Sequence, residues 1–478
     1  MATSFYFYDL ETSGVNPREA RIMQFAGQRT TLDLDVLDDP HNVLVQLPDD
    51  VLPEPDAILI TGITPQQTKS EGVTEAEFLK LFYEEIATPG TIFVGFNTVR
   101  FDDEFMRFLH WRNFYDAYEW QWKDDRSRWD LLDVVRMTRA LRPEGINWPV
   151  DTEGRPTNRL ELLTSLNKLQ HSNAHDALSD VHATIDLARL LRARQPKLFD
   201  YLLSMRDKRA VQALVDSGQP FVYSSGKYPG EFEKTTLAVK IADHPKQGGA
   251  LVYDLRHDPE VFAAMTPEQL AEAWQWRPKD DTSPRLPIKT LKYNRCPAVA
   301  PQAVLDEQSQ ERLNIDMSVI EANRKKLAQV PHWPERLFKA LEILDRQQQT
   351  QMFASETSVD SQLYDSFCGP QDKRLFAELH QQDPDNIESF VEKFEDQRLK
   401  ALVPLYKARN FPRSLSDSER QSWELHIRRR ILDGGQNSRL AKYFRRLEEI
   451  SKRPRLTQKD HYLIEDLQMY GQSLIQSD

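Results

Sequence analysis

The 478-residue chain is long enough for about three domains, at roughly 150 residues each. Its two cysteines, Cys296 and Cys368, lie far apart without Cys-x-x-Cys spacing, which excludes a disulfide framework or a zinc knuckle and favours a reducing, cytoplasmic setting. Because the N-terminus lacks a signal-peptide pattern and no apolar run has the length of a membrane span, we expect the protein to be neither exported nor membrane-embedded.

The charge of the chain is unevenly distributed. A formal net charge of −12 usually argues against a nucleic-acid binder, because phosphates favour a basic surface. Between Ile427 and Arg455, however, ten lysines and arginines stand against three acids. This segment is interpreted either as a local track for phosphates or as a solvated helix face.

The first part of the chain alternates between strand and helix patterns. Runs rich in β-branched and aromatic residues predict strands at 4–9, 21–36 and 91–96. Helical periodicity appears at 73–87, 130–141, 159–168 and 176–193. Since Pro196 follows the last of these helices, we predict a mixed α/β domain over residues 1–195.

The remainder of the chain predicts two further domains. Short strand-like runs at 221–223, 235–241, 250–255 and 286–293 predict a small, mostly β unit of the barrel type over residues 196–350. Within it, Thr266-Pro267-Glu268-Gln269 has the pattern of a helix capping box. The polar run 347–351 is interpreted as a linker or an exposed helix end. After it, helical patterns at 363–367, 390–394 and 440–447 predict an all-α domain over residues 351–478.

Two carboxylates follow the first predicted strand. Asp9 and Glu11 lie at the end of the aromatic run Phe5-Tyr6-Phe7-Tyr8, and alternation along a strand places residues i and i+2 on one face. Like charges held this close raise each other's pKa unless a cation lies between them. Hard oxygen ligands favour Mg²⁺ or Mn²⁺ over zinc, so the pair predicts half of a metal site.

Another carboxylate follows a second apolar strand. The segment Asn97 to Asp102 comes directly after Ile92 to Phe96, so Asp102 is expected beside a strand end. Asp103 and Glu104 compete for the same role, and spacing alone does not choose among the three. A loop or helix-capping aspartate is the alternative interpretation.

The segment from His171 to Asp180 contains two overlapping His-x4-Asp patterns. Asp176 stands directly before an apolar helical pattern, where a capping aspartate is expected. Asp180 lies one turn further along, where a capping role is no longer available. We therefore interpret Asp180 as a metal ligand, with His175 on the preceding loop.

Together these motifs resemble the DEDD exonucleases, in the subclass with histidine in the third motif, and longer segments resemble the bacterial exonuclease I family. These segments are Leu59–Pro65, Asn97–Glu104, Ser127–Asp133, Leu141–Pro149, Ser172–Ala177 and Ala408–Pro412. The resemblance covers nearly the whole chain and is weakest over residues 225–285. It implies an α/β RNase H-like exonuclease domain, followed by an SH3-like, mostly β domain and an all-α C-terminal domain. It also implies processive 3′→5′ removal of mononucleotides from single-stranded DNA.

The resemblance assigns roles to the motif residues. Asp9 would bridge two Mg²⁺ ions, for which Mn²⁺ would substitute. Glu11 and Asp180 would complete the first site, and Asp102 would hold the second ion, partly through water. Two such ions can stabilise the charge on the attacking and leaving oxygens of a phosphodiester. His175 would act as general base toward the attacking water, a role suited to a group that titrates near neutral pH.

The resemblance also implies substrate contacts from cations, aromatic side chains and one turn. These residues are Arg107, Arg136, Arg159, Tyr118, Trp122 and Thr61-Gly62-Ile63, together with Glu11. Tyr118 and Trp122 are equally interpretable as core residues, because clustered aromatic side chains usually pack together. Thr61-Gly62-Ile63 is expected to shape the pocket for the terminal nucleotide, since glycine permits close backbone approach, with an ordinary turn as the alternative.

Three functions are considered. The first is an exonuclease that degrades single-stranded DNA in repair or recombination. The second is an RNA-trimming or proofreading 3′→5′ exonuclease, since the metal site does not distinguish DNA from RNA. The roughly 280 residues after Pro196 argue against the compact trimming enzymes. The third is a non-catalytic single-strand-binding module, which the presence of all five motif residues disfavours.

A partner is implied as well, namely the acidic C-terminal tail of the single-stranded DNA-binding protein. Arg142 and Arg312 are the candidate contacts, and a solvated surface charge is the alternative for each. The sequence gives no sign of obligatory oligomerisation, so we expect a monomer.

Overall fold

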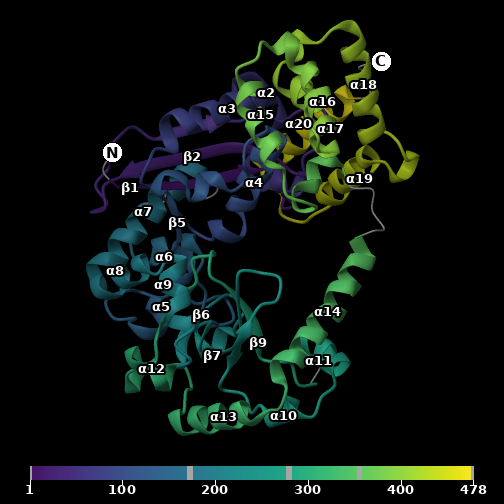
Figure 1. The fold of residues 1–478 in the computed structure, drawn as a ribbon. Helices are drawn as coiled ribbons and strands as arrows, with labels where there is room; N and C mark the ends of the chain where they lie inside the picture. Colours follow the sequence, from purple (N-terminus) through teal and green to yellow (C-terminus); the bar gives the residue numbers. More distant parts are fainter. Residues whose placement is uncertain (1–2, 170–175, 276–282, 353–357, 475–478) are drawn as a thin grey trace. The chain divides into compact units, whose positions relative to one another are not determined.

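The computed structural model describes residues 3–169, 176–275, 283–352 and 358–474 (Figure 1). The chain divides into two compact units. The first comprises the described parts of residues 1–127, 172–182 and 357–478, and the second those of residues 128–171 and 183–356. No helix in these described ranges is both long enough and apolar enough to cross a membrane.

The first unit contains a mixed sheet with β1 at its centre. β1 (Ser4–Thr12) pairs antiparallel with β2 (Ile22–Thr30) and parallel with β4 (Thr91–Gly95). β3 (His41–Leu44) pairs antiparallel with the other edge of β2, and β5 (Ser127–Asp130) begins where the second unit starts. The aromatic run 5–8 is buried within β1, as predicted. Asp9 and Glu11 therefore emerge from a central, tightly packed strand.

Two helices, α3 (Glu75–Leu81) and α4 (Asp102–Arg112), pack on this sheet through an aromatic core. The unit also contains α1 (Pro55–Thr61), α2 (Pro65–Glu71) and the start of α7 (Ala177–Arg194). Phe25 of β2 packs on Phe78 of α3, and Phe93 of β4 packs on Trp120. Since these side chains are all buried, the core fixes the strand ends that carry the acidic motifs.

Two predicted elements differ from the observed ones. The strand predicted over 21–36 stops at Thr30, because the backbone turns at Leu34, whose φ is 73°, and the amide of Thr31 donates to the carbonyl of Asp35 (2.8 Å). The helix predicted over 73–87 begins at Glu75 behind a capping box at Thr74. It then changes to the π-helix η1 (Phe82–Ile86), which periodicity does not predict.

The C-terminal part of the first unit is helical, as predicted. Its elements are η7 (Val359–Tyr364), α15 (Pro370–His380), α16 (Phe390–Lys393), α17 (Gln397–Asn410), α18 (Asp417–Ile431), α19 (Arg439–Ser451) and α20 (Gln458–Ser473). Helices α19 and α20 share an apolar cluster with Ile58 and Ile63, which lie in and directly after α1. The C-terminal helices are therefore packed directly against the part of the unit that carries the motifs.

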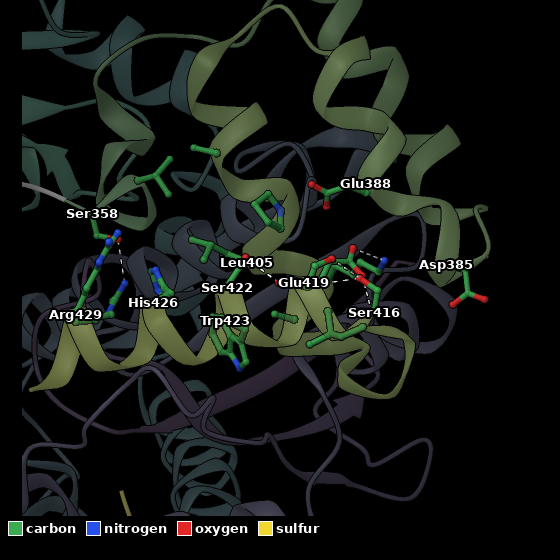
Figure 2. Close-up of a pocket in the computed structure, with 18 residues that line it drawn as sticks. Ser358, Asp385, Glu388, Leu405, Ser416, Glu419, Ser422, Trp423, His426 and Arg429 are labelled. Atoms are coloured by element: carbon green, nitrogen blue, oxygen red, sulfur yellow. Dashed lines mark hydrogen bonds and ion pairs between the residues drawn. The ribbon is translucent and has the colours of Figure 1, made fainter. Parts of the chain in front are cut away.

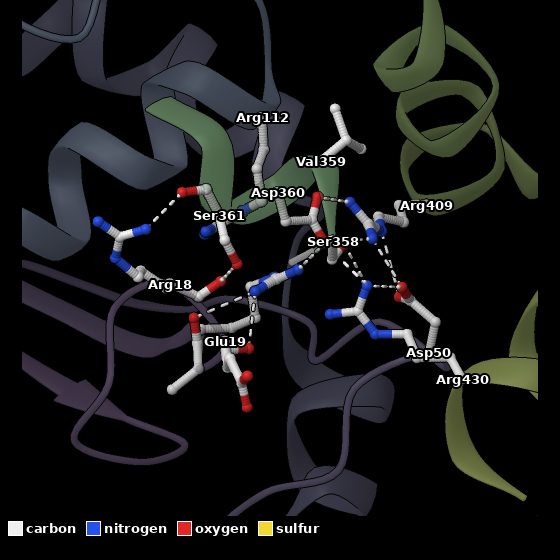
Figure 3. A network of polar contacts seen from close by, with 12 residues as sticks. Arg18, Glu19, Asp50, Arg112, Ser358, Val359, Asp360, Ser361, Arg409 and Arg430 are labelled. Carbon is white, nitrogen blue, oxygen red and sulfur yellow. Dashed lines mark hydrogen bonds and ion pairs between the residues drawn. The ribbon is translucent and has the colours of Figure 1, made fainter. Parts of the chain in front are cut away.

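A buried ion network strengthens this packing (Figure 3). Asp360 of η7 accepts hydrogen bonds from Arg21 (2.9 Å), Arg409 (2.8 Å) and Arg430 (3.1 Å). Arg409 also binds Asp50 (2.6 Å), which lies in the N-terminal part of the chain. Burial alone would raise the pKa of Asp360, but Arg409 and Arg21 outweigh it and hold the pKa well below its usual range. The network thus connects residues more than three hundred positions apart in the sequence.

The basic segment 427–455 contributes to the same packing. Arg446 and Arg453 both bind Asp56 on α1, at 2.7 and 2.6 Å. Arg430 lies inside the network, and Arg439 pairs with Glu19 (3.5 Å). Part of this positive charge therefore neutralises acids of the N-terminal part, so only a portion of the segment remains for the predicted phosphate track.

The second unit contains an antiparallel sheet in the order β10-β6-β7-β8-β9. The strands are β6 (Phe221–Ser224), β7 (Thr235–Asp243), β8 (Gly249–Asp254), β9 (Ile288–Lys292) and β10 (Ala298–Pro301). The four predicted runs correspond to β6 through β9. Besides the rest of α7, its helices are α5 (Leu131–Leu141), α6 (Leu160–Leu166), α8 (Pro196–Ser204), α9 (Lys208–Val215), α10 (Glu260–Ala263), α11 (Pro267–Trp274), α12 (Glu307–Arg312), α13 (Met317–Gln329) and α14 (Trp333–Met352). Thr266 and Gln269 form the predicted reciprocal capping box at the start of α11.

Candidate active site

Three carboxylates converge in the first unit. Asp9 and Glu11 lie on one face of β1, and Asp180 lies in the first turn of α7. Their ligand oxygens all lie within 4.8 Å of one another. The structure thus brings together residues that the sequence places about 170 positions apart, as a shared metal site requires.

The carboxyl groups of this acidic cluster raise each other's pKa. Burial, followed by the charges of Asp102 and Asp180, holds the pKa of Asp9 well above its usual range. Burial, and then the charges of Asp9 and Asp180, raises the pKa of Glu11 to about 9. At neutral pH the cluster is therefore electrostatically unfavourable without a compensating positive charge.

A divalent cation fits the acidic cluster. Among the described residues, no lysine or arginine forms an ion pair with Asp9 or Glu11. The converging atoms are carboxylate oxygens, which are the ligands that hard cations such as Mg²⁺ and Mn²⁺ prefer. Asp9, Glu11 and Asp180 are the residues that would hold such an ion.

The structure distinguishes the three acids at the start of α4. Asp103 accepts a hydrogen bond from the Tyr8 hydroxyl (2.7 Å) inside the core, and Glu104 forms an ion pair within α4 (2.6 Å). Of the three acids, it is Asp102 whose charge contributes to the raised pKa of Asp9. This position beside the acidic cluster supports Asp102 as the fourth metal ligand, and the assignment stays a prediction.

The third motif is only partly described. His175 lies outside the described residues, so its role as general base stays a prediction. Asp176 directly precedes α7, and its backbone carbonyl accepts from the Asp180 amide (3.0 Å), as predicted for the residue that begins the helix. Its carboxylate also accepts from the side-chain amide of Gln24 (3.4 Å). Asp176 therefore lies at the edge of the site as well as at the helix start.

A cavity of about 530 Å³ lies beside Asp176. It is lined by Gln24, Asn42, Leu44, Thr61, Gly62, Ile63, Gln67, Glu71 and Asp176. Gly62 caps α1 with a φ of 74°, in the left-handed region that favours glycine. Gln24 lies opposite Glu11 in the β1–β2 register, so this cavity, here called the terminal pocket, adjoins the acidic cluster. Its volume is that of a small-molecule site and suits one nucleotide.

Gln24 and Asn42 are pocket residues that the sequence reasoning does not identify. They are hydrogen-bonded to each other (2.8 Å) across β2 and β3. The sequence gives only a weak indication of this role, because Gln24 is a single polar residue between apolar neighbours in a predicted strand. Only the pairing of β2 with β1 shows that Gln24 faces the carboxylates.

Family models match three successive parts of the chain. The exonuclease model matches residues 6–188, the exonuclease I SH3-like domain matches residues 206–342, and the exonuclease I C-terminal domain matches residues 357–474. Exodeoxyribonuclease I of Escherichia coli K12 is 38% identical over 430 residues, which cover 89% of each chain. The chain belongs to the exodeoxyribonuclease I family. The Haemophilus influenzae member is 37% identical over 435 residues, 90% of each chain.

Solved structures of exonuclease I share the fold. Exonuclease I from Methylocaldum szegediense has a TM-score of 0.91 and 39% identity, with 99% of this chain and 100% of that chain covered. The zinc-ion-bound E. coli ExoI–ssDNA complex has a TM-score of 0.91 and 35% identity at the same coverage. A structure of SSB/exonuclease I with the inhibitor CFAM has a TM-score of 0.88 and 34% identity, again at that coverage. The predicted class of an α/β exonuclease domain, an SH3-like domain and a helical C-terminal domain is confirmed.

Arg107, Tyr118 and Trp122 lie near one another in the first unit but in different environments. Arg107 is 5% exposed, and its guanidinium donates to Gln121 (3.1 Å) and lies 5.5 Å from the centre of the Tyr118 ring. Trp122 is 61% exposed, which argues against the core interpretation for this residue. The geometry therefore favours Arg107 as a support for Tyr118 and leaves Trp122 available to stack on a base.

The other predicted arginines lie in the second unit. Arg136 forms an ion pair with Asp133 on α5, and Arg159 is an exposed residue directly before α6. Arg142 donates to the carbonyl of Val304 (2.9 Å), and Arg312 donates to the carbonyl of Ala140 (2.7 Å). Arg142 and Arg312 thus both lie where α5 meets the region of α12, although they are far apart in sequence.

A second cavity in the first unit, of about 1130 Å³, lies between α17 and α18 (Figure 2). Figure 2 shows His426 and Arg429 toward one end of its lining and Asp385 toward the other. Trp423 and His426 stack on each other, with ring centres 5.3 Å apart. None of the acidic-cluster residues lines this cavity, so the candidate metal site lies outside it.

Proposed function

We propose that this protein is a metal-dependent exonuclease that removes 5′-mononucleotides processively from the 3′ end of single-stranded DNA. The observation that carries the proposal is the acidic cluster beside a pocket large enough for one nucleotide. Its E. coli relative bears the name exodeoxyribonuclease I, and an E. coli structure contains single-stranded DNA. The match over nearly the full chain supports the same substrate class here.

We propose Mg²⁺ as the working cation, with Mn²⁺ able to replace it. Asp9, Glu11 and Asp180 would hold one ion, and Asp9 with Asp102 would hold a second. When bound, such ions stabilise the negative charge that develops on the attacking and leaving oxygens of the phosphodiester. His175, five positions before Asp180, is proposed to take the proton from the attacking water.

The rest of the proposed site positions the DNA strand. The terminal pocket would hold the 3′ nucleotide, because Thr61, Gly62 and Ile63 bring their loop to its wall. Trp122 and Tyr118 would stack on upstream bases, which is worth about 1–3 kcal/mol per base in single-strand binders. Arg136 and Arg159 are proposed phosphate contacts from the second unit.

The proposed activity predicts that 5′-labelled single-stranded DNA is shortened to mononucleotides in Mg²⁺ and left intact in EDTA. Matched RNA and blunt duplex DNA should be shortened much more slowly, because the proposal takes its substrate class from relatives that are named exodeoxyribonuclease I and are seen with single-stranded DNA. Gel analysis of the labelled strands over time is the measurement. Faster shortening of RNA would move the assignment to an RNA-trimming enzyme, and binding without cleavage would indicate a non-catalytic module.

We also propose that the acidic C-terminal tail of the single-stranded DNA-binding protein binds the second unit at Arg142 and Arg312. A solved structure combining SSB with exonuclease I supports the partner class. The two side chains are 35% and 25% exposed, so each can reach an incoming carboxylate.

We further propose that the protein acts as a monomer, with domains at residues 1–195, 196–350 and 351–478.

Charge reversal at Arg312 should weaken binding of a tail peptide about tenfold, because a favourable contact with an acidic peptide becomes repulsive. Fluorescence anisotropy with a labelled acidic peptide measures the affinity. Arg324→Glu is a matched control, since Arg324 is a surface arginine of the same unit with a local partner, Glu321 (3.1 Å). Equal affinity of Arg312→Glu and the control would remove Arg312 from the contact.

A further inference from the structure

We propose that Lys459, from the C-terminal helix α20, binds a backbone phosphate of the DNA strand at the rim of the terminal pocket. This inference rests on the proposed function and adds a positioning residue from a part of the chain that carries none of the three motifs. Three observations support it: the closeness of the ammonium group to Gly62, the packing that fixes α20, and the charge of the pocket.

The Lys459 side chain lies against the backbone of Gly62. A Cβ atom built on Gly62 would lie 2.9 Å from Nζ and 3.2 Å from Cε of Lys459. Gly62 itself belongs to the pocket wall and joins α1 to α2. The absence of a side chain at this position therefore lets the ammonium group of Lys459 approach the pocket loop.

The position of Lys459 is fixed by the packing of α20. Thr457 and Asp460 form a capping box that sets the start of the helix. Further along, the Gln66 side chain of α2 donates to the carbonyl of Asp466 (2.7 Å). Leu467 lies buried in the apolar cluster that also contains residues of α1. Since both ends of the pocket loop belong to helices packed on α20, Lys459 and the loop are held together.

The pocket needs a positive charge to accept DNA. Its charged lining residues are Glu71 and Asp176, and it adjoins the acidic cluster, so a phosphate group would meet only repulsion from these side chains. Cations bound at the cluster would act on the scissile phosphate, whereas Lys459 lies at the pocket loop, where it would meet a neighbouring phosphate of the proposed strand. Lysine is suited to this contact because its compact ammonium group binds phosphate as a point charge.

Lys459 differs from the neighbouring basic side chains. Arg453 pairs with Asp56 (2.6 Å), and Lys452 pairs with Glu448 (2.6 Å). Among the described residues, no carboxylate lies within ion-pair distance of Lys459, and its side chain is exposed. Its charge is therefore available to a ligand, whereas Lys452 and Arg453 already have ion-pair partners.

The test compares the wild type with Lys459→Ala, Lys459→Arg and the matched control Lys452→Ala. Binding of 5′-fluorescein-labelled dT16 is measured by anisotropy in EDTA, which prevents cleavage, over a range of salt concentrations. Loss of one phosphate contact should weaken binding by Lys459→Ala about five- to tenfold at low salt and reduce the slope of log K against log salt by about 0.7. Lys459→Arg should retain most of the affinity, and Lys452→Ala should match the wild type.

Replacing single phosphates of the oligonucleotide by neutral methylphosphonates locates the contact. The penalty of Lys459→Ala should disappear when the contacted phosphate near the 3′ end is neutral, and it should persist for the other positions. In Mg²⁺, Lys459→Ala should raise KM for single-stranded DNA and leave kcat within about twofold.

Several outcomes would contradict this inference. If Lys459→Ala binds dT16 with the affinity and the salt slope of the wild type, Lys459 does not contact a phosphate. The proposed function would still stand, provided that the wild type shortens single-stranded DNA in Mg²⁺. Equal losses in Lys459→Ala and Lys452→Ala would show a general charge effect and would also remove it. A wild type that neither binds nor shortens single-stranded DNA would overturn the proposed function, and the Lys459 contact with it.

Discussion

Replacing Asp180 by alanine should reduce the rate of single-stranded DNA hydrolysis by more than about a hundredfold, since loss of a residue that merely supports a metal ligand already costs about 10–100-fold. The reason is that Asp180 supplies one of the three carboxylates whose oxygens lie within 4.8 Å of one another. Without it, Asp9 and Glu11 from a single strand must hold the cation alone. Initial rates of shortening of 5′-labelled DNA in Mg²⁺ give the measurement.

Stability measurements separate this catalytic loss from misfolding. The pKa of Glu11 is raised to about 9, by burial first and then by Asp9 and Asp180. A carboxyl group whose folded-state pKa exceeds the unfolded value costs stability as pH rises between the two values, so removal of Asp180 relieves part of that cost at pH 7. In EDTA, Asp180→Ala should therefore unfold at the same temperature as the wild type or at a higher one. Addition of Mg²⁺ should raise the Tm of the wild type more than that of the variant.

A matched control lies on the same helix. Asp186 of α7 pairs with Arg189 three residues later (2.9 Å) and lies outside the acidic cluster. Asp186→Ala should retain wild-type nuclease activity, because a partly exposed i,i+3 pair contributes little. Near-normal activity in Asp180→Ala would contradict the assignment of this residue to the metal site.

The carboxylates of the acidic cluster were predictable because local rules place them. Asp9 and Glu11 share a face through strand alternation, which is a short-range rule. Asp180 follows from the position of Asp176 at a helix start. The choice between Asp102 and Asp103 was different. It depends on the hydrogen bond between Tyr8 and Asp103, which are 95 positions apart, and spacing within one motif carries no such information.

The Thr61-Gly62-Ile63 side of the terminal pocket was predicted, but its Gln24 side and the packing of the C-terminal helices depend on contacts between distant residues. Gln24 faces the site only because of its register against Glu11, and Lys459 reaches Gly62 from nearly four hundred residues away. The basic segment 427–455 shows that composition does not predict which partners charged side chains bind. Its charge suggested a phosphate track, whereas Arg446 in fact binds an aspartate of α1. Sequence pattern thus predicts which faces are polar but not which partner each face meets.

The second large effect is expected at Asp360. Its carboxylate is fully buried and accepts hydrogen bonds from Arg21, Arg409 and Arg430. Asp360→Asn preserves size but leaves these guanidinium groups with less compensating charge, and breaking a buried ion pair in this way costs about 3–5 kcal/mol. Urea denaturation followed by circular dichroism measures the loss, and limited proteolysis shows whether the C-terminal helices open first.

The pH dependence of this effect has a defined sign. Because the arginines hold the folded-state pKa of Asp360 well below its usual range, its ionised form stabilises the fold above the unfolded value of about 3.9, and this stabilisation is lost as pH falls. The stability difference between wild type and Asp360→Asn should therefore be largest at neutral pH and shrink in acid. A difference that stays constant down to pH 3 would indicate lost packing rather than lost charge.

A second substitution tests whether charge balance is the cause. In the buried network four arginines, at 21, 112, 409 and 430, stand against the three acids Asp50, Glu75 and Asp360. Adding Arg430→Met to Asp360→Asn restores the original excess of one positive charge. The double variant should therefore lose less free energy of unfolding than the sum of the losses measured for the two single variants. Asp433→Asn, an exposed aspartate just after α18, should change stability by less than about 0.5 kcal/mol. If the losses in free energy of unfolding of the two single variants add up to that of the double variant, the ions do not act together. The C-terminal helices would then be held by their apolar contacts alone.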